Sequence, residues 1–312
     1  MKRTTVSALL LALLTAPAYA QTLLEEHFDD AALASRGWYD NTKVEISTAE
    51  KYKGAGSAQY TFNAGATTPT SGGAIRHKIP ETESVYIRYY IKYSSNWVGS
   101  GKSYHPHQFY FMTNKDSEWS GLAETYLTAY LEDNGGQLQF VIQDTKNIDN
   151  SRINVDLTTV TEARAVAGCN GGDDDYSTVT CYRSGSTYRN GRTWKTGVKS
   201  FSDAQGPNYK GDWHLVEAYF KLNSIAGGKG QPDGVIRIWV DGQKILDRSN
   251  IMMRTAKNAD MRINQVAIGP YIGDGSPVRQ SFWVDELLVA TERPQSDVAP
   301  PSAPHNLRVA MP

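Results

Sequence analysis

The stretch Val85-Tyr-Ile-Arg-Tyr-Tyr-Ile-Lys-Tyr93 decides the fold class, because its residues alternate strictly in character. In an extended strand, successive side chains point to opposite faces of the sheet. One set is suited to a hydrophobic core: Val85, Ile87, Tyr89, Ile91 and Tyr93. The other set is aromatic and cationic and is predicted to line an outer surface: Tyr86, Arg88, Tyr90 and Lys92.

The same alternation recurs along the chain, whereas helical periodicity is nearly absent. Two short segments, Asp133-Asn-Gly-Gly136 and Asp241-Gly242, are typical of tight hairpin turns. Long strands at this spacing without intervening helices predict an all-β, two-sheet antiparallel sandwich. Besides 85–93, the expected strands are 27–29, 44–47, 58–62, 74–79, 107–112, 125–132, 137–143, 213–223, 235–240, 243–246, 262–269 and 281–290.

The two ends of the chain differ in composition from the body. Residues 1–20 combine Lys2 and Arg3, an apolar run and Ala18-Tyr-Ala20, the order that is typical of a secretory signal peptide. Residues 294–312 are rich in proline and are predicted to be an extended tail. We therefore expect one β domain over 21–293, secreted to the periplasm or the extracellular space.

Charge and apolar runs bear on the partners. The formal net charge of the chain is −1, without a basic stripe that would favour nucleic acid. No segment after the N-terminal run is apolar for the roughly 20 residues that a spanning helix needs. These observations predict neither a nucleic-acid nor a membrane partner, and they leave the oligomeric state open.

The segment 145–209 interrupts the strand pattern, being polar and rich in Gly, Asp, Ser and Thr. It contains the two cysteines of the chain, Cys169 and Cys181. In an exported protein such a pair predicts a disulfide, here one that pins a long loop.

Four motifs carry a resemblance to a known family: Trp213-His-Leu-Val-Glu-Ala-Tyr-Phe-Lys-Leu-Asn223, Asp233-Gly-Val-Ile-Arg-Ile-Trp-Val-Asp-Gly242, Glu26-His-Phe-Asp-Asp30 and Phe282-Trp-Val-Asp-Glu286. Together they resemble the concanavalin A-like lectin/glucanase superfamily over roughly residues 22 to 292. The pattern is most similar to the jelly-roll polysaccharide lyases of the heparinase I, alginate and glucuronan type. The resemblance implies a jelly-roll fold and a polysaccharide partner, one that carries uronate carboxylates if the protein is a lyase.

A lyase that cleaves by β-elimination must neutralise a uronate carboxylate, remove the C5 proton and protonate the departing O4. We predict His107 or Tyr110 as the base, Arg88 as the carboxylate clamp and Gln108 as a supporting donor. In a regular strand His107 would face away from Gln108 and Tyr110, but Pro106 permits a bulge that changes this direction. The expected substrate-binding residues are Tyr86, Tyr90, Lys92, Tyr126, Tyr130, Gln139, Arg237 and Trp239.

Other functions stay open at this point. Hydrolysis by paired glutamates is the weaker enzymatic interpretation, because no strand carries the Glu-x-Asp-x-x-Glu pattern and Glu217 has no second carboxylate on its strand. A non-catalytic glycan-binding, adhesion or structural domain would show the same patterning. No cofactor is required for β-elimination, and no metal ligand set is evident. A structural calcium is conceivable at Asp173-Asp-Asp175 or between Asp29 or Asp30 and Asp285.

Overall fold

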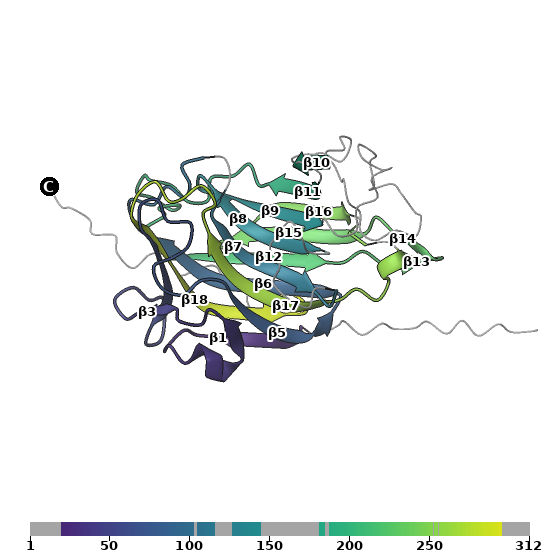
Figure 1. Ribbon diagram of the computed structural model, residues 1–312, viewed down its shortest axis with the longest axis horizontal. Coiled ribbons are helices and arrows are strands. Elements are labelled where there is room, and N and C mark those ends of the chain that lie inside the picture. Colours follow the sequence, from purple (N-terminus) through teal and green to yellow (C-terminus); the bar gives the residue numbers. More distant parts are fainter. Residues whose placement is uncertain are drawn as a thin grey trace, which may run out of the picture.

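The structure, a computed structural model, describes residues 20–102, 105–115, 127–144, 181–184, 187–251, 253–254 and 256–294. These residues form two stacked β-sheets in which every strand pairing is antiparallel (Figure 1). The described helices, η1 (Leu33–Arg36) and η4 (Ala256–Asn258), are single 3-10 turns. None of the helices in these ranges is long and apolar enough to cross a membrane. The prediction of an all-β sandwich is confirmed.

The first sheet has, in spatial order, β16 (Gln243–Ile251), β15 (Gly234–Val240), β12 (His214–Lys221), β6 (Ser84–Tyr93), β18 (Gln280–Ala290), β4 (Ser57–Phe62) and β3 (Glu45–Ser47), with β1 (Thr22–Glu26) also paired to β18. In Figure 1 the purple β1 lies beside the yellow β18.

The second sheet has, in spatial order, β10 (Cys181–Ser184), β11 (Thr187–Lys195), β9 (Gln137–Asp144), β8 (Thr128–Asn134), β7 (His107–Thr113), β17 (Ile263–Tyr271), β5 (Ile75–Thr82) and β2 (Trp38–Asp40). A small separate hairpin, β13 (Ile225–Ala226) with β14 (Lys229–Gly230), lies in the Gly-rich connection between β12 and β15.

The hydrophobic core fills the space between the sheets. The ring of Tyr89 from β6 stacks on Phe109 from β7 at 4.0 Å between centroids, and Phe111 from β7 faces Phe220 from β12 at 6.2 Å. Each such side chain contributes about 1.5–3 kcal/mol when it is fully buried. The five β6 residues that the alternation assigned to the core all lie in this cluster: Val85, Ile87, Tyr89, Ile91 and Tyr93.

Both predicted hairpin turns are present. Gly135 and Gly136 join β8 to β9 with φ of 59° and 86°, and Asp241 and Gly242 join β15 to β16 with φ of 50° and 78°. Two central residues with positive φ are what a two-residue hairpin with the right-handed strand twist requires.

The structure corrects the predicted strands at three places. The first strand is Thr22–Glu26 and not 27–29, and the short β2 has too little alternation to be recognised. The segment 145–209 is not a continuous loop, because β10 and β11 form its later part. The predicted disulfide stays a prediction, since Cys169 and the side chain of Cys181 lie outside the described residues.

Candidate active site

The residues predicted to form one groove lie on two opposite outer faces of the sandwich. Tyr110, Tyr130, Val141 and Ala267 form an apolar cluster on the second sheet, separate from the core between the sheets. A second separate cluster on the first sheet contains Tyr86, Tyr219, Trp239, Leu288 and Ala290. Because the main core occupies the space between the sheets, these clusters lie on opposite outer faces.

This arrangement divides the predicted site. The strands of the first sheet carry Tyr86, Arg88, Tyr90, Lys92, Arg237 and Trp239, and the outer face of the second sheet carries His107, Tyr110, Tyr130 and Gln139. Tyr126 lies outside the described residues. The prediction that Arg88 and His107 share one groove is therefore wrong. Alternation along a strand shows which side chains share a face, but it does not show which sheet the strand joins.

Gln108 faces neither surface. It lies between the sheets, where its amide donates a hydrogen bond to the Tyr93 hydroxyl and its Oε1 accepts one from the Tyr89 hydroxyl at 3.3 Å. Its predicted role as a donor to substrate is therefore wrong, and it joins two buried tyrosines instead.

The first-sheet aromatics near Glu217 serve packing and not a groove floor. The Tyr86 side chain is fully buried and its hydroxyl donates to Glu217 at 2.7 Å. Arg293, which follows the last strand, donates to both oxygens of Glu217 at 2.7 and 2.9 Å, and its guanidinium lies 4.7 Å from the Trp239 ring centre. A bidentate pair with a stacked guanidinium closes this part of the face.

On the second sheet, polar side chains form a row across five adjacent strands. Lys195 on β11 pairs in register with Gln139 on β9, which pairs with Glu132 on β8. Glu132 pairs with His107 on β7, and His107 with Tyr271 on β17. Four inter-strand steps span about 19 Å. We refer to these five residues as the polar row.

A β-bulge places two of the predicted residues together. The register between β7 and β8 shifts between His107 and Phe109, so that two β7 steps oppose one step of β8. As a result His107 and Tyr110 lie on the same outer face, with Nδ1 of His107 2.6 Å from the Tyr110 hydroxyl. The bulge that Pro106 was expected to permit is present.

Hydrogen bonding defines the tautomer of His107. Its Nε2 lies 3.2 Å from Oε2 of Glu132, and an ionised carboxylate can only accept. Nε2 of the neutral ring therefore carries the proton and donates it, which leaves Nδ1 as an acceptor for the Tyr110 hydroxyl. Carboxylate, imidazole and phenol thus form a directed chain that can take a proton at its phenol end, as in a hydrolase triad.

Glu132 is held firmly in this chain. It is only 3% exposed, and its Oε1 accepts hydrogen bonds from the His105 backbone N–H at 2.9 Å and from Nε2 of Gln139 at 2.7 Å. Oε1 of Gln139 is buried without a hydrogen-bond partner in the structure. A buried acceptor of this kind is costly unless a donor reaches it.

His105 is a neutral donor beside the polar row. Its Nδ1 accepts the backbone N–H of Gly273 at 3.0 Å, so its own proton is on Nε2. Burial, together with the nearby His107, lowers the pKa of His105 to about 4, so the ring is uncharged at neutral pH. The His105 ring lies 4.5 Å from that of His107 and 5.6 Å from that of Tyr271.

Accessibility distinguishes the three tyrosines of this face. Tyr110 and Tyr130 are 2% and 4% exposed, and burial raises the pKa of both well above the ordinary value, so that both phenols keep their protons at neutral pH. Tyr271 is 40% exposed and its ring lies 5.9 Å from that of His107. Tyr271 is therefore the most accessible of the three phenols.

Two glycines make room for these rings. A Cβ on Gly269 would overlap the Tyr110 ring, and a Cβ on Gly273 would lie 2.5 Å from Cε1 of His105. The motif Gly269-Pro-Tyr-Ile-Gly273 thus presents Tyr271 and accommodates its two neighbours.

The sequence interpretation assigned no role to Glu132, His105, Tyr271 or Lys195. The first could have been found, because the alternation that places Tyr130 outward also places Glu132 outward. Tyr271 was missed because the predicted strand ended at Gly269, before Pro270, whereas β17 continues to Tyr271. Lys195 joins the row only through the pairing of β11 with β9, and β11 lies in the segment that was predicted to be a loop.

Asp285 and Asp30, two of the residues proposed for calcium, do not fit a cation. The Asp285 carboxylate accepts backbone N–H groups of Tyr52 and Lys53 at Oδ2 and of Glu286 at Oδ1, and Asp30 pairs with Arg36. N–H groups aimed at the oxygens occupy the positions that a cation would need. No group of three His, Cys, Asp or Glu side chains suitable for a metal occurs among the described residues, and Asp173-Asp-Asp175 lies outside them.

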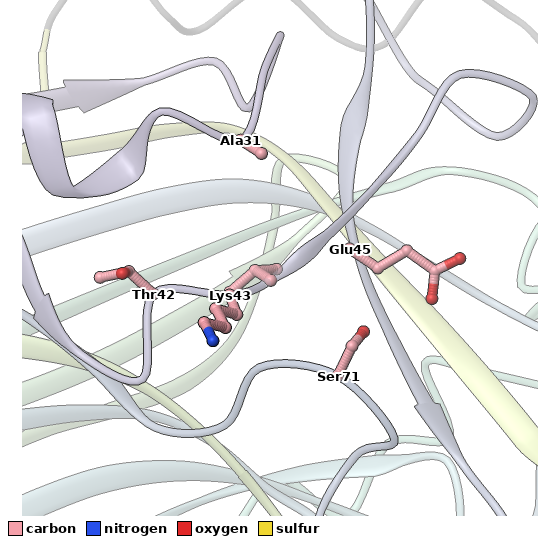
Figure 2. Close-up of a pocket in the computed structure, with 6 residues that line it drawn as sticks. Ala31, Thr42, Lys43, Glu45 and Ser71 are labelled. Atoms are coloured by element: carbon pink, nitrogen blue, oxygen red, sulfur yellow. The ribbon is translucent and has the colours of Figure 1, made fainter.

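A hollow elsewhere on the surface lacks such chemistry. Its volume is about 560 Å³, and it is lined by Ala31, Thr42, Lys43, Val44, Glu45 and Ser71. Figure 2 shows the Lys43 ammonium and the Glu45 carboxylate pointing in different directions. It shares no residue with the polar row and offers no acid–base pair.

Comparisons with known proteins bear on the fold and the family. Two solved alginate lyases share the fold: one from a Chlorella virus (14% identity, TM-score 0.52, 87% of this chain and 98% of that chain) and the PL-14 enzyme from Aplysia kurodai (11% identity, TM-score 0.51, 88% and 98%). No curated protein gives a significant match. The family model described as Polysaccharide lyase matches residues 20–288, most of the chain. The protein belongs to the polysaccharide lyase family.

Proposed function

We propose that this polysaccharide lyase cleaves a uronate-containing polysaccharide by β-elimination at the polar row. The observation that carries the proposal is the Glu132–His107–Tyr110 chain, in which the His107 ring lies 5.9 Å from the ring of the exposed Tyr271. The likeness to two alginate lyases supports an anionic polymer as substrate.

The Tyr110–His107 pair is the base in this proposal. The Tyr110 hydroxyl passes its proton to Nδ1 of His107 as the phenolate oxygen takes the C5 proton of the uronate. The electron pair of the C5–H bond forms the C4–C5 double bond, and the C4–O4 bond breaks. The Glu132 carboxylate stabilises the imidazolium that forms.

Tyr271 is the acid that protonates the departing O4. It is the exposed phenol of the cluster, so it can contact the glycosidic oxygen from the solvent side. Proton donation by a positioned side chain contributes about 10²–10⁴-fold to a rate.

Polar groups at both ends of the cluster recognise the sugar. The Nε2–H group of His105 is a neutral hydrogen-bond donor for the uronate carboxylate. Because this hydrogen bond withdraws negative charge from the carboxylate, it makes the C5 proton more acidic. Gln139 offers its unpartnered Oε1 to a sugar hydroxyl. Lys195, exposed at the end of the row, provides a cation for a carboxylate further along the polymer.

The test is the ultraviolet absorbance of the unsaturated product during incubation with alginate, polyglucuronate and hyaluronan. We expect product from at least one polymer with the wild-type protein, and rates lowered by about 10²-fold or more for His107→Gln and Tyr271→Phe. Their folding would be checked by circular dichroism. If wild-type protein forms no unsaturated product but a polymer still retards it in an affinity gel, the protein binds glycans without cleaving them.

Export is part of the same proposal. Residues 1–20 have the charge, apolar run and small residues of a signal peptide, and an enzyme that cleaves polymers acts where they occur, outside the cytoplasm. Sequencing the N-terminus of the protein recovered from its natural host would show Gln21 if the segment is removed.

A further inference from the structure

The outer face of the first sheet has an aromatic surface that the proposed active site does not use. Tyr52 is 43% exposed, one of the most exposed large hydrophobic side chains of the described residues. Its ring stacks on Tyr90 of β6 with 3.5 Å between centroids and 12° between planes, and the Trp213 ring lies 6.2 Å away at 65° to it. Tyr90 covers one face of the Tyr52 ring, and the residue still exposes 43% of its surface.

The loop that carries Tyr52 is anchored and not freely mobile. The backbone N–H groups of Tyr52 and Lys53 donate to Oδ2 of the buried Asp285 at 2.8 and 3.0 Å. The Ser57 hydroxyl donates to the Glu50 carbonyl, and the Ala55 N–H donates to Asp29. A ring held in place before binding loses little conformational entropy when a ligand stacks on it.

Lysines flank this ring. Lys51 and Lys53 are both exposed, on either side of Tyr52 in the sequence. Lys51 forms no ion pair within the described ranges, and Lys53 lies 3.6 Å from Glu286. Lys92, two residues beyond Tyr90 on β6, pairs with Glu50 at 2.6 Å. The surface therefore combines a flat apolar ring with Lys51, which has no ion pair in the described ranges, and with Lys53, whose ammonium group lies 3.6 Å from Glu286.

We infer that Tyr52, with Lys51 and Lys53, forms a second, non-catalytic binding surface for an anionic polysaccharide, on the face opposite the polar row. Pyranose rings present apolar C–H faces that stack on an exposed tyrosine, and carboxylates of a polyuronate pair with flanking ammonium groups. The inference rests on the proposed function for the identity of the polymer. A second contact on one polymer raises the apparent affinity without taking part in the chemistry.

The test separates binding from turnover. Wild-type protein and Tyr52→Ala would be run in native gels containing alginate, polyglucuronate or hyaluronan, with hydroxyethyl cellulose as the uncharged polymer. Turnover would be followed on short oligosaccharides made from the same polymers. Val278→Ala, an exposed apolar residue at another place, is the matched control.

We expect Tyr52→Ala and the double variant Lys51→Ser/Lys53→Ser each to weaken retardation by a polyuronate about fivefold, the size of one lost stacking or ionic contact. Turnover of short oligosaccharides should stay as in wild type. Retardation of both variants equal to that of wild type in every gel, or wild-type retardation by the uncharged polymer alone, would overturn the inference.

Tyr271→Phe makes the two proposals distinguishable. It should lose turnover and keep wild-type retardation through the Tyr52 surface. If retardation depends on Tyr52 but no polymer is cleaved, the binding surface stands and the proposed reaction fails. If cleavage occurs and retardation depends only on the polar row, the proposed reaction stands and the second surface fails.

Discussion

Glu132 is a buried carboxylate whose task in this account is to fix the protonation of one imidazole. Because it accepts from Nε2 of His107, it keeps Nδ1 free of a proton and directed at Tyr110. A glutamine of the same shape would offer an amide that can donate to Nε2 and reverse the tautomer. The residue therefore acts through His107 without contacting substrate.

Glu132→Gln should lower kcat by roughly 10²–10⁴-fold while the fold is retained, the size seen when a carboxylate that orients an imidazole is replaced. The measurement is kcat as a function of pH, since a positioning role predicts a change in the pH profile as well as in the rate. An unchanged profile with full activity would remove Glu132 from the chain.

Gly273 leaves space for the His105 ring, so we expect its substitution to affect catalysis. Its φ is not in the left-handed region, so alanine is compatible with the backbone, but a Cβ would press on the His105 ring. Gly273→Ala should displace that ring and raise KM or lower kcat by about tenfold, with a small loss of stability.

A matched glycine serves as the control. Gly73 also lacks a positive φ, and the nearest neighbour of an added Cβ there is the amide of Asn41, the end of a flexible side chain. Gly73→Ala should keep wild-type kinetics. Equal kinetic effects of Gly73→Ala and Gly273→Ala would mean that Gly273 affects activity only through general stability.

At the scale of single elements, β12 begins with a charged histidine. Nδ1 of His214 lies 2.7 Å from Oδ2 of Asp241, and Nε2 lies 2.8 Å from the Tyr209 carbonyl. Both partners are acceptors, so both ring nitrogens must carry protons. Burial by itself lowers the pKa of His214, but the hydrogen bond and charge of Asp241, with the Tyr209 carbonyl, outweigh it and raise the pKa above 6.5.

This pKa shift predicts a pH-dependent stability. A group whose pKa is raised on folding contributes stability that is complete below its unfolded pKa, about 6.5, and is lost as the pH rises through the folded value. The free energy of unfolding should therefore fall with rising pH above about 6.5, and the part of this fall that His214 contributes should be absent from His214→Gln.

The effect is the difference between the unfolding free energies of wild type and His214→Gln, measured by urea unfolding across this pH range. Burial raises the pKa of Asp133 to about 7, and this carboxyl also favours lower pH, but its contribution is common to both proteins and cancels. Parallel curves for wild type and His214→Gln would contradict a charged His214.

The elements also show what the sequence could and could not predict. The alternation in β6 and β9 and the Gly135-Gly136 turn are local, and each was predicted correctly. The bulge in β7 was foreseen only as an option at Pro106, because a bulge depends on the partner strand. The end of β17 was predicted too early, since Pro270 normally weakens a strand, and Tyr271 was lost with it.

At the scale of the whole molecule, the sandwich presents two outer faces that the sequence could not tell apart. β6 and β7 follow each other in the chain, yet β6 pairs with β12 and β18 in one sheet, and β7 pairs with β8 and β17 in the other. These pairings depend on contacts between residues far apart in the chain. The family and the polysaccharide partner could be predicted from motifs, whereas the division of the predicted site residues between two sheets required the structure.

The most direct test of this division compares two variants, one on each face. In initial-rate assays of unsaturated product on the same polyuronate, Tyr271→Phe should lower kcat/KM by about 10²-fold or more, while Arg88→Ala should stay within about threefold of wild type. The reverse result, with Arg88→Ala inactive though folded and Tyr271→Phe active, would place the chemistry on the first sheet and contradict the account.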